Sequence, residues 1–124
     1  MALSIPPEQM QKYKHTAQAR WQIQRAQQRL RQQQAWQLAR EAAKLLKEEY
    51  DAERVVVFGS LTHSDRFSTR SDVDLAAWGL TAANWLRARA KVRNLSSEIE
   101  LNLVDVACCL PELLAIIERE GMLL

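Results

Sequence analysis

The sequence contains little of what builds a disulfide framework, a metal-binding loop or a membrane span. Its only cysteines, Cys108 and Cys109, are adjacent, which excludes a disulfide framework and a C-x-x-C metal pair. We interpret them as small, partly buried residues in a reducing compartment. No apolar run approaches the roughly 20 residues that a membrane span requires. We therefore expect no membrane-spanning segment.

Features of a secreted chain are also missing. The first ten residues, MALSIPPEQM, lack the basic and apolar regions of a signal peptide, so we expect a cytoplasmic protein. The composition, 48% hydrophobic and 26% charged, is typical of a soluble globular protein. A chain of 124 residues is large enough for one full-sized domain and too short for two.

Glycine and proline are scarce, with three of each, and neither occurs between Pro7 and Gly59. All glutamines lie between Gln9 and Gln37, among good helix formers, which predicts a long helix beginning soon after Pro7. Residues 1–50 carry nine Lys/Arg against four Glu, and residues 51–124 carry eight Lys/Arg against eleven Asp/Glu. Residues 1–50 are thus basic, with a charge of +5, and residues 51–124 are acidic, with a charge of −3.

The apolar pattern divides this long helix into two parts. Before residue 35 the apolar residues form only a thin stripe, whereas the later part has one continuous apolar face. That face consists of Trp36, Leu38, Ala42, Leu45, Leu46 and Tyr50. We predict a basic, Gln-rich helical extension over residues 1–34 and a folded domain over residues 35–124.

Downstream, alternating strand and helix patterns indicate a small α/β sheet. RVVVFGS predicts a strand buried on both faces, followed by a loop over residues 59–71 and the strand DVDLAAW. TAANWLRARAKVRNL predicts a helix capped by Thr81, and SEIELNLVDV predicts a third strand. LPELLAIIERE predicts a last helix, with Pro111 near its start and Gly121 just past its end.

Asp72 and Asp74 are the first candidates for chemistry. Side chains alternate along a strand, so the two carboxylates lie on one face, about 7 Å apart, while Val73 and Leu75 point into the core. Neighbouring carboxylates repel each other, and a hard divalent cation that takes oxygen ligands relieves this. A pair of Mg²⁺ ions about 3.5 to 4 Å apart would suit a phosphoryl or nucleotidyl transfer.

The Gly-Ser pair between the two strands completes the pattern. Gly59 has no Cβ, so backbone N–H groups can approach an anion, and Ser60 adds a hydroxyl donor. We predict that Gly59 and Ser60 hold a triphosphate from one side and that Asp72 and Asp74 hold its metal from the other.

The stretch FGSLTHSDRFSTRSDVDL resembles the signature of the polymerase-β-like nucleotidyltransferase superfamily. In size and element order, roughly residues 36–120 resemble its minimal nucleotidyltransferase (MNT) branch. The resemblance implies a small mixed sheet flanked by helices, here with a long N-terminal helix. It also implies ATP as the substrate, Mg²⁺ on Asp72 and Asp74, and nucleotide contacts at Gly59 and Ser60. We add Arg70 and Ser71 as nucleotide-binding candidates; Arg70 is equally well explained as a loop charge that favours solubility.

The family's third carboxylate is missing from its expected place. The best match, LNLVDV, has Asn102 there, and an amide cannot act as a base. If Leu101 and Leu103 face the core, Glu100 shares the opposite face with Asn102, and Asp105 falls on the core side unless the strand has ended. Glu100 is therefore the first candidate for base and metal ligand, and Asp105 the second candidate for base.

Two functions follow from these patterns. The resemblance implies a Mg²⁺-dependent enzyme that transfers AMP from ATP to a tyrosine of a partner HEPN-domain RNase toxin, acting as antitoxin. Alternatively, catalysis has faded through Asn102 and the fold binds a partner without transfer. The basic, Gln-rich extension indicates a binding partner under either function. We favour self-association or protein docking over nucleic acid only slightly.

Overall fold

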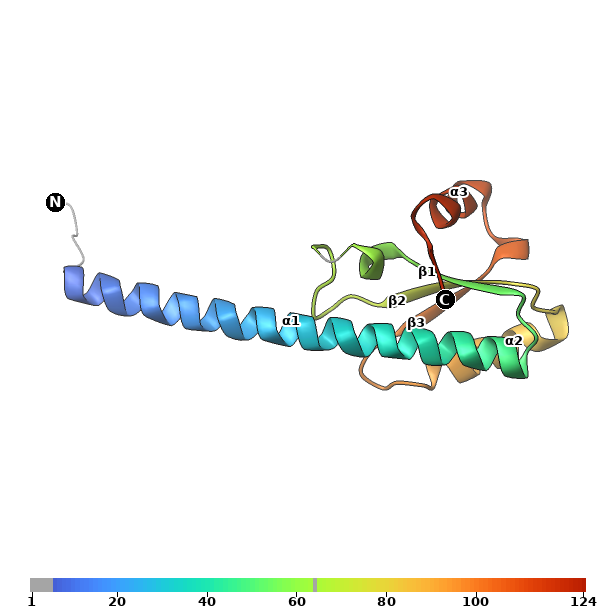
Figure 1. Cartoon of the computed structure of the whole chain (residues 1–124), viewed down its shortest axis with the longest axis horizontal. Helices are drawn as coiled ribbons and strands as arrows, with labels where there is room; N and C mark the ends of the chain where they lie inside the picture. The colour runs from blue at the N-terminus through green and yellow to red at the C-terminus, as the bar shows by residue number, and fades with distance from the viewer. Residues whose placement is uncertain (1–5, 64) are drawn as a thin grey trace.

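The computed structural model describes residues 6–63 and 65–124 (Figure 1). Its elements are α1 (Pro7–Glu49), β1 (Arg54–Phe58), the 3₁₀ helix η1 (Gly59–Thr62), β2 (Val73–Trp78), α2 (Ala82–Arg93), β3 (Leu101–Asp105), the 3₁₀ helix η2 (Val106–Cys108), α3 (Pro111–Glu120) and β4 (Met122–Leu123). None of the helices in the described residues has the length and apolar character needed to cross a membrane.

The strands form one mixed sheet in the order β3-β2-β1-β4. β2 and β3 run parallel, while β1 pairs antiparallel with both β2 and β4. The mixed sheet confirms the predicted fold class, but the expected three strands were one too few. β4 was missed because a two-residue strand shows no periodicity; only its pairing with the edge of β1 defines it.

Helices cover both faces of the sheet, with α1 and α2 on one side and α3 on the other (Figure 1). In β1, Val55 and Val57 belong to the core beneath α1, and Val56 and Phe58 belong to the smaller core beneath α3. All four side chains are less than 10% exposed, which confirms the predicted burial on both faces. β1 pairs with β2, and the candidate site lies where β1 ends and β2 begins.

Local signals placed the ends of the later helices correctly. The hydroxyl of Thr81 accepts a hydrogen bond of 3.2 Å from the backbone N–H of Asn84 and so caps α2. Pro111 occupies the first turn of α3, and Gly121 is its C-terminal cap. The third strand is shorter than expected and covers only residues 101–105 of the predicted stretch.

α1 is one continuous helix of 43 residues, and its contacts change along its length. Every side chain from residue 6 to residue 27 is exposed, whereas fully buried side chains begin at Ala35. Between them, Gln28 Nε2 donates to the carbonyl of Phe67, and Arg31 Nη2 donates to the carbonyl of Ser71 at 3.4 Å. The division at residue 34 stays a proposal, and these two hydrogen bonds cross it.

Two truncations distinguish the possible boundaries. Deleting residues 1–20 should leave the free energy of unfolding unchanged, because the described part of that segment is fully exposed. Deleting residues 1–34 should lower it by about 1–3 kcal/mol, because the hydrogen bonds of Gln28 and Arg31 are lost as well. Urea unfolding followed by circular dichroism measures both values. Equal stability of the two shortened chains would place the start of the domain at residue 35.

Candidate nucleotide-binding site

The site begins where β1 ends. The antiparallel register pairs Phe58 with Asp74, which brings Gly59 next to the Asp74 side chain. Gly59 has φ +79°, and a Cβ added there would lie 2.6 Å from Asp74 Oδ2. A side chain at position 59 would therefore be strained and would displace the carboxylate. Gly59, predicted to let a phosphate approach the backbone, also leaves room for the Asp74 carboxylate.

The chain turns sharply after Gly59. Thr62 Oγ1 donates to the carbonyl of Gly59 at 2.8 Å, and the His63 N–H donates to the carbonyl of Ser60 at 3.1 Å. These bonds close the 3₁₀ helix η1. The half-buried Ser60 makes no side-chain hydrogen bond to any other described residue.

β2 places Val73 and Leu75 on one face and Asp74 on the other as predicted, although the face of Asp74 also carries the buried Ala76. Val73 and Leu75 are fully buried in the core that α1 and α2 cover. Asp74 alternates with them and lies on the opposite face, and Asp72 is half-buried directly before the strand. Asp72 and Asp74 thus border the same end of the sheet as Gly59 and Ser60.

The parallel register between β2 and β3 pairs Asp74 with Asn102. The Asn102 side-chain amide donates to Asp74 Oδ1 at 3.3 Å. A neutral amide, rather than a third carboxylate, is therefore the immediate neighbour of Asp74 on the next strand.

The two candidates for the missing acid lie elsewhere. Glu100 precedes β3, and its Oε1 accepts a hydrogen bond of 2.9 Å from Arg93 Nη2 at the end of α2. Asp105 ends β3 opposite Ala77, three residues and about 10 Å along the strand from Asn102, which pairs with Asp74. There its carboxylate accepts from the Ala107 N–H at 3.2 Å and caps η2. Both catalytic assignments stay predictions, and Glu100 is the nearer of the two.

The acidic end of the sheet is electrostatically unbalanced. Burial raises the pKa of Asp74 above its ordinary value, and the charges of Asp72 and Glu100 raise it further, against the opposing hydrogen bond from Asn102. Across residues 6–63 and 65–124, neither Asp72 nor Asp74 forms an ion pair with Lys, Arg or His.

This imbalance fits a bound divalent cation, because oxygen ligands from Asp72 and Asp74 would then face a positive charge. The same described segments contain no group of three or more His, Cys, Asp or Glu side chains that could hold a metal ion. Asp72 and Asp74 could hold a cation only together with further ligands, such as phosphate oxygens. A second ion stays a proposal that rests on the resemblance.

The other nucleotide-binding candidates belong to the turn before Asp72. Ser71 Oγ accepts from the Ser68 N–H at 2.9 Å, and the Arg70 N–H donates to Ser68 Oγ at 3.2 Å. These bonds shape the turn itself, and the Arg70 side chain is exposed. Nucleotide contacts of Arg70 and Ser71 stay predictions.

Two residues of α1 that were not predicted from the sequence hold this loop in place. Gln28 binds the carbonyl of Phe67, and Arg31 binds the carbonyls of Ser71 and, at 3.5 Å, of Glu98. Both were assigned to the extension because they are polar. Their helical phase, shared with the buried Ala35, was the signal that could have identified them.

Replacing Asp74 by Asn should raise the melting temperature of the ligand-free protein at pH 7. Because folding raises the pKa of Asp74, its contribution to stability is fully present below its ordinary pKa of 3.8 and is lost as pH rises through the folded value. The advantage of the variant should therefore grow with pH and vanish near pH 3. Thermal unfolding at several pH values measures it, with the exposed loop variant Asp65→Asn as control. A lower melting temperature at pH 7 would reveal a stabilising role for the charge.

No family model matches the sequence, and no curated protein matches it. Solved structures do match, each with a probability of 1.00. A toxin–antitoxin complex with AMP-PNP superposes with a TM-score of 0.57 at 19% identity, covering 68% of this chain and 70% of that chain.

Two mutants of the MntA–HpeT toxin–antitoxin complex also match. One, with two aspartates two positions apart replaced by glutamate, has a TM-score of 0.54 at 18% identity and covers 68% of this chain and 70% of that chain. The other, with a tyrosine replaced by alanine, has a TM-score of 0.53 at 20% identity and covers 68% and 69%. At these identities the likeness shows the fold: the chain shares its mixed sheet flanked by helices with a component of these toxin–antitoxin complexes, which confirms the predicted fold class.

Proposed function

We propose that the protein is a Mg²⁺-dependent nucleotidyltransferase that transfers AMP from ATP to a tyrosine hydroxyl of a partner HEPN RNase toxin, and so acts as an antitoxin. One observation carries the proposal: the Asp74 carboxylate lies 2.6 Å from where a Cβ at position 59 would stand, so Gly59 gives it room, and within the described residues the Ser60 side chain beside it makes no hydrogen bond. A carboxylate held at an electrostatic cost at the end of a sheet is typical of a functional site.

Each part of the site has a task in this reaction. The turn at Gly59 and Ser60 offers a hydroxyl and backbone N–H groups to the triphosphate, and Asp72 and Asp74 hold the cation. When bound, Mg²⁺ offsets the charge of the carboxylates and of the phosphates. The tyrosine oxygen bonds to the α-phosphorus, pyrophosphate leaves, and the tyrosine proton passes to a base. Glu100 is the candidate for that base, provided that its carboxylate is released by Arg93.

The ligand and the substitutions in the similar structures support this proposal. One of those complexes was solved with AMP-PNP, a nucleotide analogue. In another, two aspartates with the spacing of Asp72 and Asp74 are replaced, and in a third a tyrosine is replaced. The substituted residue types are those that the proposed reaction uses.

The second candidate function is a binding module with the same fold. The hydrogen bond from Asn102 to Asp74 favours it, because a neutral donor occupies the position beside the metal-binding acid. The ion pair of Glu100 with Arg93 favours it as well, because it engages the nearest alternative acid. Such a protein would neutralise its partner by contact alone.

ATP binding should depend on both the cation and Gly59. Calorimetry should show binding with Mg²⁺ that weakens at least tenfold in EDTA, because the triphosphate would then face two bare carboxylates. Gly59→Ala should weaken binding about tenfold or more, because the new Cβ displaces Asp74.

Gly79→Ala is the matched control. Gly79 has φ +87°, and a Cβ there would lie 2.7 Å from Glu53 Cγ, at the other end of β2. Both substitutions should cost about 1–3 kcal/mol of stability, but Gly79→Ala should leave the affinity within twofold. Equal losses of affinity in the two variants would remove Gly59 from the site.

Restoring the family's acid should increase the rate. Asn102→Asp should raise pyrophosphate release from ATP, in the presence of a purified HEPN partner, by about tenfold or more, because a positioned base contributes roughly 10²- to 10⁴-fold. Glu100→Gln should lower the rate strongly, and Asp105→Asn should leave it unchanged.

The remaining outcomes separate the alternatives. If Asp105→Asn abolishes transfer while Glu100→Gln does not, the base has been assigned to the wrong residue. A protein that silences its partner regardless of all three substitutions is a binding module.

A further inference from the structure

The free part of α1 extends well beyond the sheet (Figure 1). Residues 7–27 are all exposed and span about 30 Å. We call this segment the arm. Neither the nucleotide site nor the domain core accounts for it.

The arm has an apolar stripe along one face. Met10, Tyr13, Ala17 and Trp21 follow one another at spacings of three and four residues, so they line one side of the helix. Met10 is 40% exposed, Tyr13 65% and Trp21 56%. Large aromatic side chains on an unpacked helix face indicate a surface that another molecule covers.

This stripe continues the face by which α1 packs against its own domain. Trp21, Gln28, Ala35 and Ala42 succeed one another every seven residues, about two helical turns. Ala35 and Ala42 are fully buried, and Gln28 binds the loop at Phe67. The face therefore carries small residues where the sheet approaches it and large residues where it is free. That change suits a second packing surface of a different shape.

Positive charge surrounds the stripe. Residues 7–34 contain six Lys/Arg and one acid, Glu8. By helical phase, Lys14 and Arg25 flank the stripe on one side and Arg20 on the other. The Arg25 guanidinium lies 4.8 Å from the centre of the Trp21 ring.

With Glu8 as its only acid, the arm has a single acid–base pair at i, i+4, Glu8 with Lys12, of the kind that stabilises an isolated helix. Two arms from copies of this chain would bring like charges together, which argues against the self-association that the sequence left open. The charge pattern instead fits a partner with acidic flanks.

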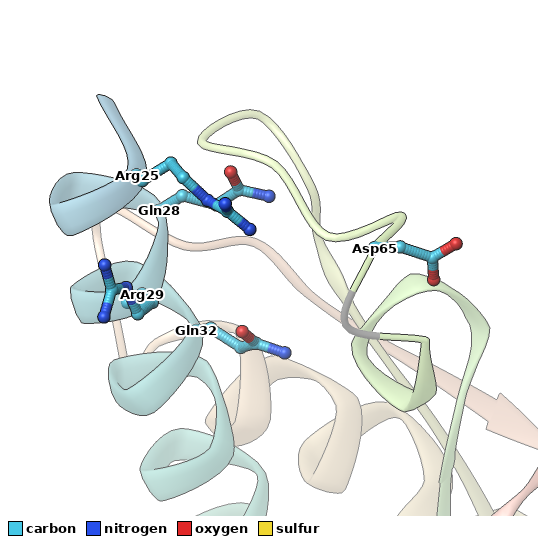
Figure 2. A pocket seen from close by; sticks show the side chains of 5 residues that line it. All are labelled: Arg25, Gln28, Arg29, Gln32 and Asp65. Carbon is cyan, nitrogen blue, oxygen red and sulfur yellow. The ribbon is translucent and has the colours of Figure 1, made fainter. Parts of the chain in front are cut away.

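A polar pocket of about 710 Å³ lies where the stripe reaches the domain. Arg25, Gln28, Arg29 and Gln32 of α1 line it, together with Asp65 of the loop that follows Ser60. Figure 2 shows Gln28 and Gln32 extending from α1 toward this loop, whereas the Asp65 carboxylate points away from them. The pocket thus presents mainly guanidinium and amide donors, which suit a carboxylate.

We propose that the stripe, its basic flanks and this pocket form one docking surface for an acidic amphipathic helix of a partner protein. The apolar side of that helix covers Tyr13 and Trp21, and its acids pair with Lys14, Arg20 and Arg25. An acid at its end enters the pocket. A nucleic-acid backbone would use the charges but would leave the apolar stripe bare. The inference deepens the proposed partner role and does not depend on the transfer chemistry.

A synthetic peptide tests the surface directly. The probe is a labelled helix of 21 residues with Leu at the two core positions of each heptad and Glu at the flanking positions. Fluorescence anisotropy with the full chain should show saturable binding. Trp21→Glu should weaken it at least tenfold, and Ile23→Glu, on the opposite side of the arm and 58% exposed, should leave it within twofold. Likewise, Arg20→Glu should weaken binding, and Lys12→Glu on the opposite side should not.

Several results would overturn the proposal. Equal losses of peptide affinity in Trp21→Glu and Ile23→Glu would show that the apolar stripe is not part of the docking surface. Polyglutamate or a single-stranded RNA oligonucleotide binding as tightly as the peptide would show that charge alone acts. A dimer of the full chain that Trp21→Glu dissociates, measured by light scattering, would make a second copy the occupant. ATP binding by Trp21→Glu should equal that of the parent chain, so failure of the docking surface is distinguishable from failure of the nucleotide site.

Discussion

The contact between Gly59 and the Asp74 carboxylate is the constraint on which the candidate site depends. It exists because β1 and β2 pair in the register that sets Phe58 opposite Asp74. That register is held by strands whose apolar side chains are buried, since a slip by one residue would exchange the faces of β2 and turn Asp74 into the core that α1 and α2 cover. The packing energy of the sheet thus places a carboxylate where its own charge is disfavoured.

The neighbour of Asp74 on β3 shows how the protein moderates that cost. A third acid at position 102 would add repulsion to a group whose pKa is already raised by burial and by Asp72. Asn102 instead donates a hydrogen bond, which lowers the pKa of Asp74 and stabilises its charged form. In the proposed transfer reaction, however, an amide at position 102 could not serve as a base. Under that proposal, the difference between an enzyme and a binding module depends on this side chain and on the ion pair of Glu100 with Arg93.

α1 connects the site to the rest of the molecule. Its buried alanines let the helix approach the sheet closely, and Gln28 and Arg31 fix the loop that leads from Ser60 to Asp72. The same helix continues past the loop as the arm, whose exposed face keeps the phase of the buried one. A partner helix on the arm would lie next to the loop between Ser60 and Asp72, which borders the candidate nucleotide site.

The sequence by itself determined the elements whose signals are local. The buried run of β1, the alternation around Asp74, the cap at Thr81 and the Gly59-Ser60 turn each need only a few neighbouring residues, and they predicted the fold class. The long glutamine-rich helix was equally readable, because its residues favour helix wherever they occur. The proposed roles of Arg70 and Ser71 and the boundary at residue 34 stay predictions from that pattern.

Tertiary structure alone decided the partners that are distant in the chain. Asn102 meets Asp74 across 28 residues, and Gln28 meets Phe67 across 39. The same holds for β4, which exists only through its pairing with β1. Strand parity predicted one face for Glu100 and Asn102, but Glu100 precedes the strand, and Arg93 binds its carboxylate. Periodicity describes a side chain within its own element, whereas its contacts depend on which elements pack together, and that is settled only when the whole core forms.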